Sequence, residues 1–206
     1  MDLQALFRDL DNHLTHDDKP SVYLKEIKEQ DAFRQYPFTM ISDLTRVEQS
    51  PQHHPEGSVW NHILLVLDNA AALKEQSEDR RVFMWAALLH DIGKTPTTKL
   101  RKGRITSYDH DKAGEGMARE FLKFFNCPED FIQRVSRLVR WHMQILFVVK
   151  GLPFADIQKM KSQVSINEIA LLGLCDRLGR GGEVDEEGER ENIRRFIEKS
   201  QSYRHA

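Results

Sequence analysis

The sequence of 206 residues contains only two cysteines, Cys127 and Cys175. Two distant cysteines exclude both a disulfide framework and a zinc site built from thiolates, and they favour a reducing compartment. No apolar run approaches the roughly 18 residues that a membrane-spanning helix needs. The acidic, amphipathic start MDLQALFRDLD lacks the pattern of a signal peptide. We therefore expect a cytoplasmic protein without a membrane partner.

A strong excess of basic charge is also absent. Lysine and arginine total 30 and aspartate and glutamate total 32, which gives a net charge of -2. This balance argues against a protein that binds nucleic acid with its whole surface, although it allows a local basic patch. There is no internal repeat, no low-complexity segment and no alternation of strands with helices. The 40% of hydrophobic residues suit one globular domain with a substantial core.

Helical periodicity dominates the remaining pattern and predicts an all-α bundle with one small β-hairpin near 97–107. Residues 35–57, which contain three prolines, are expected to form turns and a loop. Helices are expected over DLQALFRDLDNHL, after Pro20, after Ser58 over VWNHILLVLDNAAALKEQ, over 79–93, over 110–125 with Asp109 as its cap, from Pro128 to about Met143, from Pro153, after the capping-box pattern Ser165–Glu168, and over the charged C-terminal segment.

His-Asp doublets occur three times, at 16–17, 90–91 and 110–111, and their contexts differ. The first lies in the polar run THDDKP, which is typical of a solvated linker. The second ends the apolar run RVFMWAALL. Because an ionised carboxylate in apolar surroundings costs several kcal/mol unless it is paired, the second doublet needs a compensating partner.

The same anomaly recurs on other apolar helices. His62 opens the run ILLVL, His142 follows LVRW, and Asp176 ends IALLGLC. A shared divalent cation would neutralise these side chains together with the doublet at 90–91. Imidazole and carboxylate ligands suit zinc, manganese, iron, nickel or cobalt. The sequence therefore predicts a metal site at which four helices meet.

Each of these residues also has a simpler interpretation when it is taken alone. His62 or His142 can be a core histidine with its hydrogen bonds satisfied. Asp176 can form a structural ion pair with Arg177 or Arg180. The metal interpretation depends on the residues acting as a group.

The order His62…His90-Asp91…Asp176 resembles the HD superfamily of metal-dependent phosphohydrolases. Similarity to the HD domain of bacterial CCA-adding tRNA nucleotidyltransferases extends over five blocks in the same order: HHPEGSVWNHILLVLDNAA (53–71), AALLHDIGKTPTT (86–98), GRITSYDHDKAGEGMA (103–118), LVRWHM (138–143) and CDRLGRGG (175–182). The resemblance covers roughly residues 35–182. A strand-rich nucleotidyltransferase head does not precede it, so CCA addition is not expected.

The resemblance implies a helical HD bundle and a set of ligands. His62, His90, Asp91 and Asp176 would hold one divalent ion. His110 and His142 would hold a second ion, with Asp91 as the bridge; His110 alone would instead be a surface histidine at a helix start. Whether one or two ions bind stays open, as does the choice among Mn, Ni, Mg, Fe, Co and Zn. We divide the chain into an N-terminal helical extension (1–34), the HD metal-binding domain (35–182) and a C-terminal helix packed on that domain (183–206).

The implied activity is hydrolysis of a phosphomonoester or phosphodiester, of a nucleotide or an RNA end, by a metal-activated water. Asp91, Lys94, His110 and Asp111 are the expected catalytic residues. Lys94 follows Asp91 by three positions, so its side chain points the same way if the helix continues. In that position it would offset the charge of a substrate phosphate. The alternative interpretation of Lys94 is a solvated lysine at a helix end. His110 or Asp111 would move protons. Arg180, together with Lys94, would contact the substrate phosphate.

Two other functions remain open from the sequence: a di-iron oxygenase of the HD type, and a non-catalytic HD binding module. The arginine row 134, 137 and 140 and the turn RKGR (101–104) are candidates for guiding a polyanion, although a solvated surface explains each of them. His53 and His54 are expected to line the pocket without being ligands. The sequence does not predict an oligomeric state.

Overall fold

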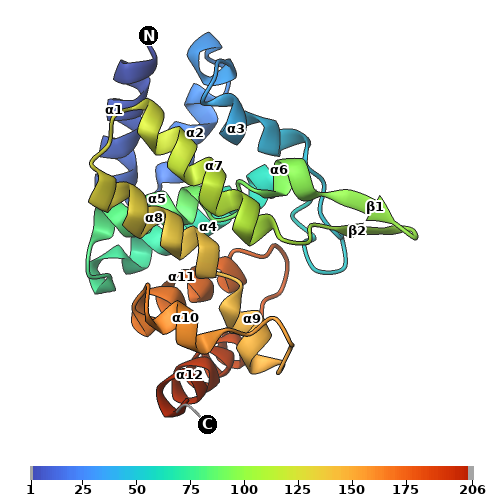
Figure 1. Ribbon diagram of the computed structural model, residues 1–206. Helices are drawn as coiled ribbons and strands as arrows, with labels where there is room; N and C mark the ends of the chain where they lie inside the picture. The colour runs from blue at the N-terminus through green and yellow to red at the C-terminus, as the bar shows by residue number, and fades with distance from the viewer. Residues whose placement is uncertain (1, 204–206) are drawn as a thin grey trace.

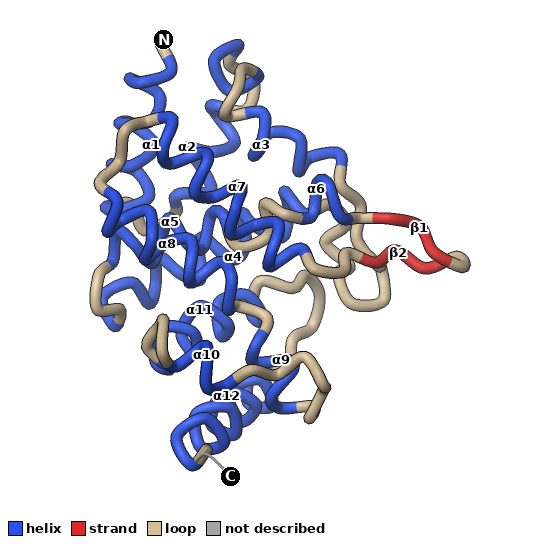
Figure 2. The backbone as a smooth tube through the Cα atoms, in the orientation of Figure 1, coloured by secondary structure: helices blue, strands red, loops and turns tan. Residues whose placement is uncertain are grey.

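The structure is a computed structural model that describes residues 2–203, and these residues form a helical bundle from which one small hairpin projects (Figures 1 and 2). The predicted all-α class and the hairpin are confirmed. The helices are α1 (Leu3–His16), α2 (Pro20–Ile27), α3 (Thr39–Ser42), α4 (Val59–Leu73), α5 (Arg80–Leu89), α6 (Lys94–Thr97), α7 (His110–Phe124), α8 (Glu129–Trp141), α9 (Gln144–Val149), α10 (Ile157–Lys161), α11 (Ile166–Leu178) and α12 (Glu186–Ser202). Short 3-10 turns span Asp31–Arg34, Asp43–Arg46 and Lys74–Gln76. The strands β1 (Lys99–Arg101) and β2 (Arg104–Thr106) pair antiparallel.

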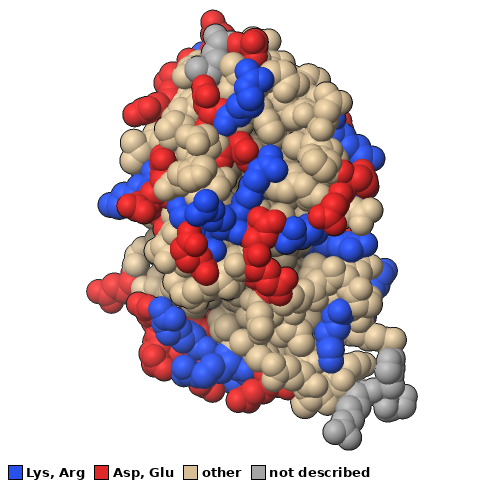
Figure 3. All heavy atoms as spheres, turned by 90° about the vertical axis from the view of Figure 1, so that its left-hand side faces the viewer, with Lys and Arg blue, Asp and Glu red and all other residues tan. Residues whose placement is uncertain are grey.

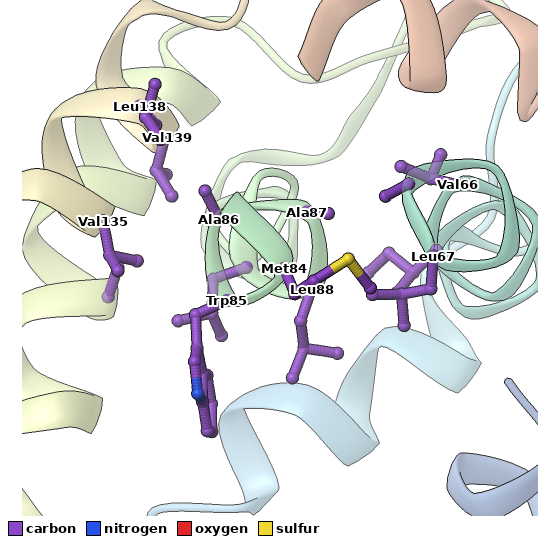
Figure 4. Packing of buried hydrophobic residues seen from close by; sticks show 14 of the residues in the cluster. Val66, Leu67, Met84, Trp85, Ala86, Ala87, Leu88, Val135, Leu138 and Val139 are labelled. Carbon is purple, nitrogen blue, oxygen red and sulfur yellow. The ribbon is translucent and has the colours of Figure 1, made fainter. Parts of the chain in front are cut away.

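Helix α5 lies at the centre of the bundle. Every residue from 82 to 93 is buried, and α1, α4, α8 and α11 all contact this helix. Figure 4 shows α5 nearly end-on, with α4 side chains packed on one side and α8 side chains on the other. A helix that is apolar on all faces is stable only when other elements cover it completely. The chain leaving α5 therefore delivers residues 90 and 91 into the middle of the molecule.

Helix α1 packs directly on this central helix. The Phe7 ring stacks on Trp85 with a centroid distance of 4.9 Å. The Asp11 carboxylate accepts hydrogen bonds from Trp85 Nε1 (2.7 Å) and Arg81 Nε (2.8 Å). At the other end of the chain, α12 contacts α9 and α11 and buries Phe196 completely. One buried apolar cluster thus includes residues from all three predicted segments of the chain.

Two predicted helix caps are wrong. Asp109 precedes α7 in the left-handed conformation (φ 60°), and its carboxylate accepts from Lys112 Nζ rather than from the helix backbone. Ser165 makes no side-chain cap at α11. The Glu168 carboxylate accepts instead from Ser77 Oγ (2.7 Å) and the Glu78 amide (3.0 Å). By contrast, Ser58 Oγ accepts from the Asn61 amide at 3.3 Å, which confirms the cap predicted for α4.

Three predicted helix boundaries also differ. Helix α5 ends at Leu89 and α8 at Trp141, so the histidine after each helix lies at a turn. The helix predicted from Pro153 begins only at Ile157, where the Asp156 carboxylate accepts from the Lys159 amide. In the first two cases, the backbone turns where a polar side chain enters the centre of the bundle. No helix among residues 2–203 is both long enough and apolar enough to cross a bilayer.

Candidate metal centre

The six residues predicted as ligands converge on one point near the end of α5. His62 lies in the first turns of α4, and His90 and Asp91 directly follow α5. His110 is the first residue of α7, His142 follows α8, and Asp176 lies in the last turn of α11. The four histidines and Asp91 are all buried, whereas Asp176 remains partly exposed. Five separate segments thus bring their ionisable side chains to the same place.

One oxygen of Asp91 faces the pair His62 and His90. Asp91 Oδ2 lies 3.4 Å from His90 Nε2 and 3.9 Å from His62 Nε2. His62 Nε2 lies 2.9 Å from Asp176 Oδ1, which brings the second carboxylate to this side. The group His62, His90 and Asp91 presents ligand atoms that all lie within 4.8 Å of one another.

The other oxygen of Asp91 faces the pair His110 and His142. Asp91 Oδ1 lies 3.3 Å from His110 Nε2 and 3.8 Å from His142 Nε2. The two Nε2 atoms are 3.2 Å apart. Asp91, His110 and His142 form a second group whose ligand atoms fit around one cation. Asp91 is thus the shared member of two three-residue groups.

In each histidine, Nδ1 is the outer nitrogen, which points away from the cluster. The hydrogen bond that Nδ1 makes fixes Nε2 as the nitrogen that faces the cluster. Nδ1 of His90, His110 and His142 donates to the carbonyl oxygens of residues 87, 107 and 139 at 2.8, 2.7 and 2.7 Å. Because a carbonyl oxygen only accepts, the proton of each neutral ring must be on Nδ1 and the lone pair on Nε2. His90 Nε2 is buried without a hydrogen-bond partner. Two Nε2 lone pairs at 3.2 Å, beside this unpartnered third one, fit a site that binds a cation.

His62 has the same orientation but a stronger outer partner. Its Nδ1 lies 3.0 Å from Glu56 Oε1 and 3.2 Å from the Gly179 carbonyl oxygen. Glu56 is held in turn by His54 Nδ1 (2.8 Å) and by the Gly181 amide, which donates to Oε2 (2.9 Å). A carboxylate that accepts from the outer nitrogen orients a ligating histidine and raises its basicity.

Both carboxylates of the cluster are ionised. Burial alone would raise the pKa of Asp91, but Lys94 and the surrounding imidazoles hold that pKa well below its usual value. For Asp176, burial is likewise outweighed, chiefly by the hydrogen bond from His62, and its pKa is also well below the usual value. The cluster therefore offers one buried and one partly buried negative charge, which a divalent cation can neutralise.

The histidines differ in how readily they take a proton. Burial opposes protonation of His62, but the hydrogen bonds with Asp176 and Glu56 outweigh it and raise its pKa to about 9. Burial and the neighbouring imidazoles lower the pKa of His142 to about 4. Burial also lowers the pKa of His110. At neutral pH, His142 and His110 are thus neutral and able to ligate, while His62 carries a proton toward Asp176.

Lys94 reaches the cluster by a different route from the one predicted. The helix does not continue past Leu89, and Lys94 instead begins the short helix α6 after a turn. Its Nζ nevertheless lies 2.7 Å from Asp91 Oδ2 and donates to Gln49 Oε1 at 2.6 Å. The side chain is only 11% exposed, so the alternative of a solvated lysine is wrong.

The other predicted side chains lie at the edge of this cluster. Asp111 is buried in an ion pair with Arg140, whose guanidinium also lies over the Trp141 ring. Arg180 lines a small cavity of about 30 Å³ together with His142 and Asp176. The Nε atom of Arg180 is buried without a hydrogen-bond partner.

Sequence reasoning missed Gln49 and Glu56. Both come from the proline-rich region 35–57, where no periodic pattern marks a residue as inward-facing. The nearest available signal was the pair His53 and His54. His54 hydrogen-bonds to Glu56 and its ring centroid lies 5.1 Å from that of His62, whereas His53 is exposed.

Comparison with known proteins agrees with this geometry. The HD domain family model matches residues 59–178. The chain is 31% identical over 148 residues to the "Multifunctional CCA protein" of Halorhodospira halophila, an alignment that covers 69% of this chain and 34% of that protein. The protein of the same name from Azoarcus sp. is 31% identical over 156 residues, an alignment that covers 71% of this chain and 35% of that protein. The protein of the same name from Actinobacillus pleuropneumoniae serotype 5b is 36% identical over 117 residues, an alignment that covers 55% of this chain and 28% of that protein. The matched region spans about a third of the length of these relatives. With more than half of its length matched by the family model, the chain belongs to the HD domain family.

Proposed function

We propose that this protein is a divalent-cation-dependent phosphohydrolase that cleaves a phosphomonoester or phosphodiester of a nucleotide or an RNA end. The observation that carries the proposal is the position of Asp91, with one oxygen toward each of two histidine pairs whose Nε2 atoms face inward. His62, His90, Asp91 and Asp176 would hold one cation.

Asp91, His110 and His142 would hold a second cation. A divalent cation supplies a water of lowered pKa and a Lewis acid for a phosphoryl oxygen. The link to nucleotides and RNA rests on the relatives, whose printed name refers to CCA.

The remaining polar side chains would bind the substrate and move protons. Lys94 places its ammonium group in the cluster, where Gln49 holds it, and it would offset the charge of a substrate phosphate. Arg180 has a free Nε beside Asp176 and would contact a phosphate oxygen. His110 and Asp111 are the candidates for proton transfer. Asp111 is already paired with Arg140, and His110 would move a proton only if its Nε2 does not hold the second cation.

Metal-reconstituted hydrolysis tests this proposal, with metal content measured on the same sample. The metal-free protein receives Mn²⁺, Ni²⁺ or Mg²⁺ and is assayed on p-nitrophenyl phosphate, bis(p-nitrophenyl) phosphate and a 2′,3′-cyclic nucleotide. We expect Asp91→Ala to lose hydrolysis by a factor on the order of a hundred or more. Asp17→Ala is the matched control, since it alters the polar His-Asp doublet at 16–17, and it should retain wild-type turnover.

Two outcomes would overturn the proposal. One is a protein that retains two irons per chain and consumes oxygen but hydrolyses no phosphate ester with any metal, as expected of an oxygenase. The other is a protein that retains no divalent ion and has no turnover, as expected of a binding module. Far-UV circular dichroism of Asp91→Ala establishes that any loss of activity occurs in a folded protein.

A further inference from the structure

The hairpin β1–β2 carries a concentration of exposed basic charge. Residues 92–108 contain five lysines and arginines and no acidic residue, in a chain whose net charge is -2. Four of the five lie in the hairpin and are exposed: Lys99, Arg101, Lys102 and Arg104. Elsewhere basic side chains are often paired, as Arg119 is with Glu129. The face opposite the hairpin shows basic and acidic residues interspersed (Figure 3).

Flat and apolar groups accompany these charges. Tyr108 is 63% exposed and Leu100 is 75% exposed. The guanidinium of Arg101 lies 5.0 Å from the centroid of the Tyr108 ring. Exposed aromatic rings and arginine planes are the surfaces on which unpaired nucleobases stack. The hairpin therefore combines unpaired cations with a stacking platform.

A groove lies at the base of the hairpin. Its volume is about 380 Å³, and it is bounded by residues 46–48 on one side and by α6 and the start of β1 on the other. Arg46 and Lys99 give it positive charge, and Glu48 is the acidic residue in its lining. Thr95 also lines the groove, and its hydroxyl is buried without a hydrogen-bond partner. The volume is near the lower end of the roughly 300–1,000 Å³ of small-molecule sites, which suits one nucleoside unit.

Both chain segments that line the groove continue into residues of the candidate metal centre. Thr95 follows Lys94, and Glu48 precedes Gln49, the two residues that hydrogen-bond next to Asp91. At the end of the hairpin, the Ser107 carbonyl oxygen accepts from His110 Nδ1 at 2.7 Å. A ligand that extends beyond the groove would follow these segments toward the cluster at one end, and along the hairpin, away from the bundle, at the other (Figure 1).

We infer that the groove and the hairpin bind the chain of a single-stranded RNA whose end enters the metal centre. The part of the inference that places the RNA end in the metal centre rests on the proposed function. A mononucleotide would fill the groove alone, whereas the unpaired cations toward the hairpin tip contact only a polymer of phosphates. Glu48 offers an acceptor to a sugar hydroxyl or a base amino group, so the groove suits a nucleoside better than a bare anion.

Binding measured without metal tests the surface independently of hydrolysis. A 5′-labelled twelve-nucleotide single-stranded RNA is titrated in EDTA by fluorescence anisotropy at several salt concentrations. The triple variant Arg101→Gln/Lys102→Gln/Arg104→Gln is compared with Lys25→Gln/Lys123→Gln/Lys159→Gln. These control lysines are also exposed, and the variant loses the same net charge. Circular dichroism checks that both variants are folded.

The hairpin variant should bind this RNA on the order of a hundredfold more weakly at low salt. The slope of log K against log salt should fall by about two, since each phosphate contact contributes about 0.7 for single strands. At about 0.15 M salt, where the screening length is about 8 Å, the control should change affinity by less than about twofold, because its charges are distant from a bound strand. Equal losses in both variants, or an unchanged slope in the hairpin variant, would overturn the inference.

A second variant separates RNA binding from general attraction of polyanions. Tyr108→Ala should weaken RNA binding by about fivefold or more, since stacking of one base on an aromatic ring contributes that much. It should leave heparin binding unchanged. Equal loss of RNA and heparin binding would overturn the inference. Hairpin-dependent RNA binding in a protein that hydrolyses no phosphate ester would uphold the surface and refute only the proposed function.

Discussion

His62 differs from the other histidines of the cluster because a cation bound there would compete with a proton for the same nitrogen. Its Nε2 is 2.9 Å from Asp176 Oδ1, and a pKa of about 9 places a proton between them at neutral pH. That proton occupies the side of the ring that a metal would take. The metal-free and metal-bound forms of the protein therefore differ by at least this proton.

The affinity of the protein for Mn²⁺ should consequently fall about tenfold for each pH unit below 9, until other ligands also become protonated. About one proton should be released per ion bound at pH 7. Calorimetry in two buffers of different ionisation enthalpy counts that proton, and a count of zero would contradict the assignment. For the metal-free protein, the raised pKa stabilises the fold below the unfolded value of 6.5, and this contribution is lost as the pH rises through 9.

Glu56 should contribute to metal affinity without touching the metal. Its carboxylate lies 3.0 Å from His62 Nδ1 and is itself strongly ionised: although burial opposes this, hydrogen bonds from His62 and the Gly181 amide lower its pKa to about 2. We expect Glu56→Gln to weaken metal binding by about 10- to 100-fold. Competition with a metallochromic dye measures this loss. Glu29→Gln, which changes an exposed glutamate paired with Arg34, should have no effect.

The histidines and aspartates of the cluster were predictable from the sequence, but the residues that hold them were not. A histidine or aspartate at the end of an apolar helix is anomalous in the sequence itself, because burial makes it costly. Gln49 and Glu56 lie in a segment of turns. The direction in which a side chain points there is decided by contacts with residues more than forty positions away. No local pattern of residue types records such contacts.

At the scale of elements, the turn between α5 and α6 decides whether the cluster forms. Residues 90–93 pack against the first turns of α7. A Cβ atom at Gly93 would lie 2.0 Å from the His110 carbonyl oxygen and 2.5 Å from the Gly114 amide nitrogen. The close approach of these two backbone segments brings His90 and Asp91 to His110.

Gly93→Ala should therefore force the two segments apart. We expect a loss of about 1–3 kcal/mol in the free energy of unfolding, the usual cost of overpacking, together with loss of metal binding. Gly116→Ala is the matched control: it lies in α7, and a Cβ atom there meets nothing within 4 Å. It should stabilise the protein by about 0.4–1 kcal/mol. Urea unfolding compares the two, and equal effects would show that the close approach is unimportant.

The periodicity that predicted the helices says little about their ends. The caps expected at Asp109 and Glu168 fail because each carboxylate has a better partner, Lys112 in one case and Ser77 in the other. Helix α8 ends at Trp141, and the following histidine is buried in the cluster. Core faces follow from local residue order, whereas the last turns of helices depend on tertiary contacts.

At the scale of the whole molecule, the cluster and the N-terminal helix belong to one apolar core. Phe7 stacks on Trp85 of the helix that delivers the doublet, and Leu10 is completely buried in the same cluster of residues. A perturbation at α1 should thus reach the metal centre through the stability of the whole bundle rather than by local contact. This predicts cooperative unfolding of residues 2–203.

Metal binding and mutation in α1 should then shift a single unfolding transition independently. Mn²⁺ at 100 times its Kd should add about 2.7 kcal/mol to the free energy of unfolding of both the wild type and Leu10→Ala. Leu10→Ala should lose about 2–5 kcal/mol with or without metal, as expected for a fully buried leucine. Val22→Ala, at a position 52% exposed, should lose less than about 0.5 kcal/mol. Circular dichroism and tryptophan fluorescence should report the same midpoint. Two separate transitions, with the metal shifting only one of them, would show that α1 folds apart from the metal centre.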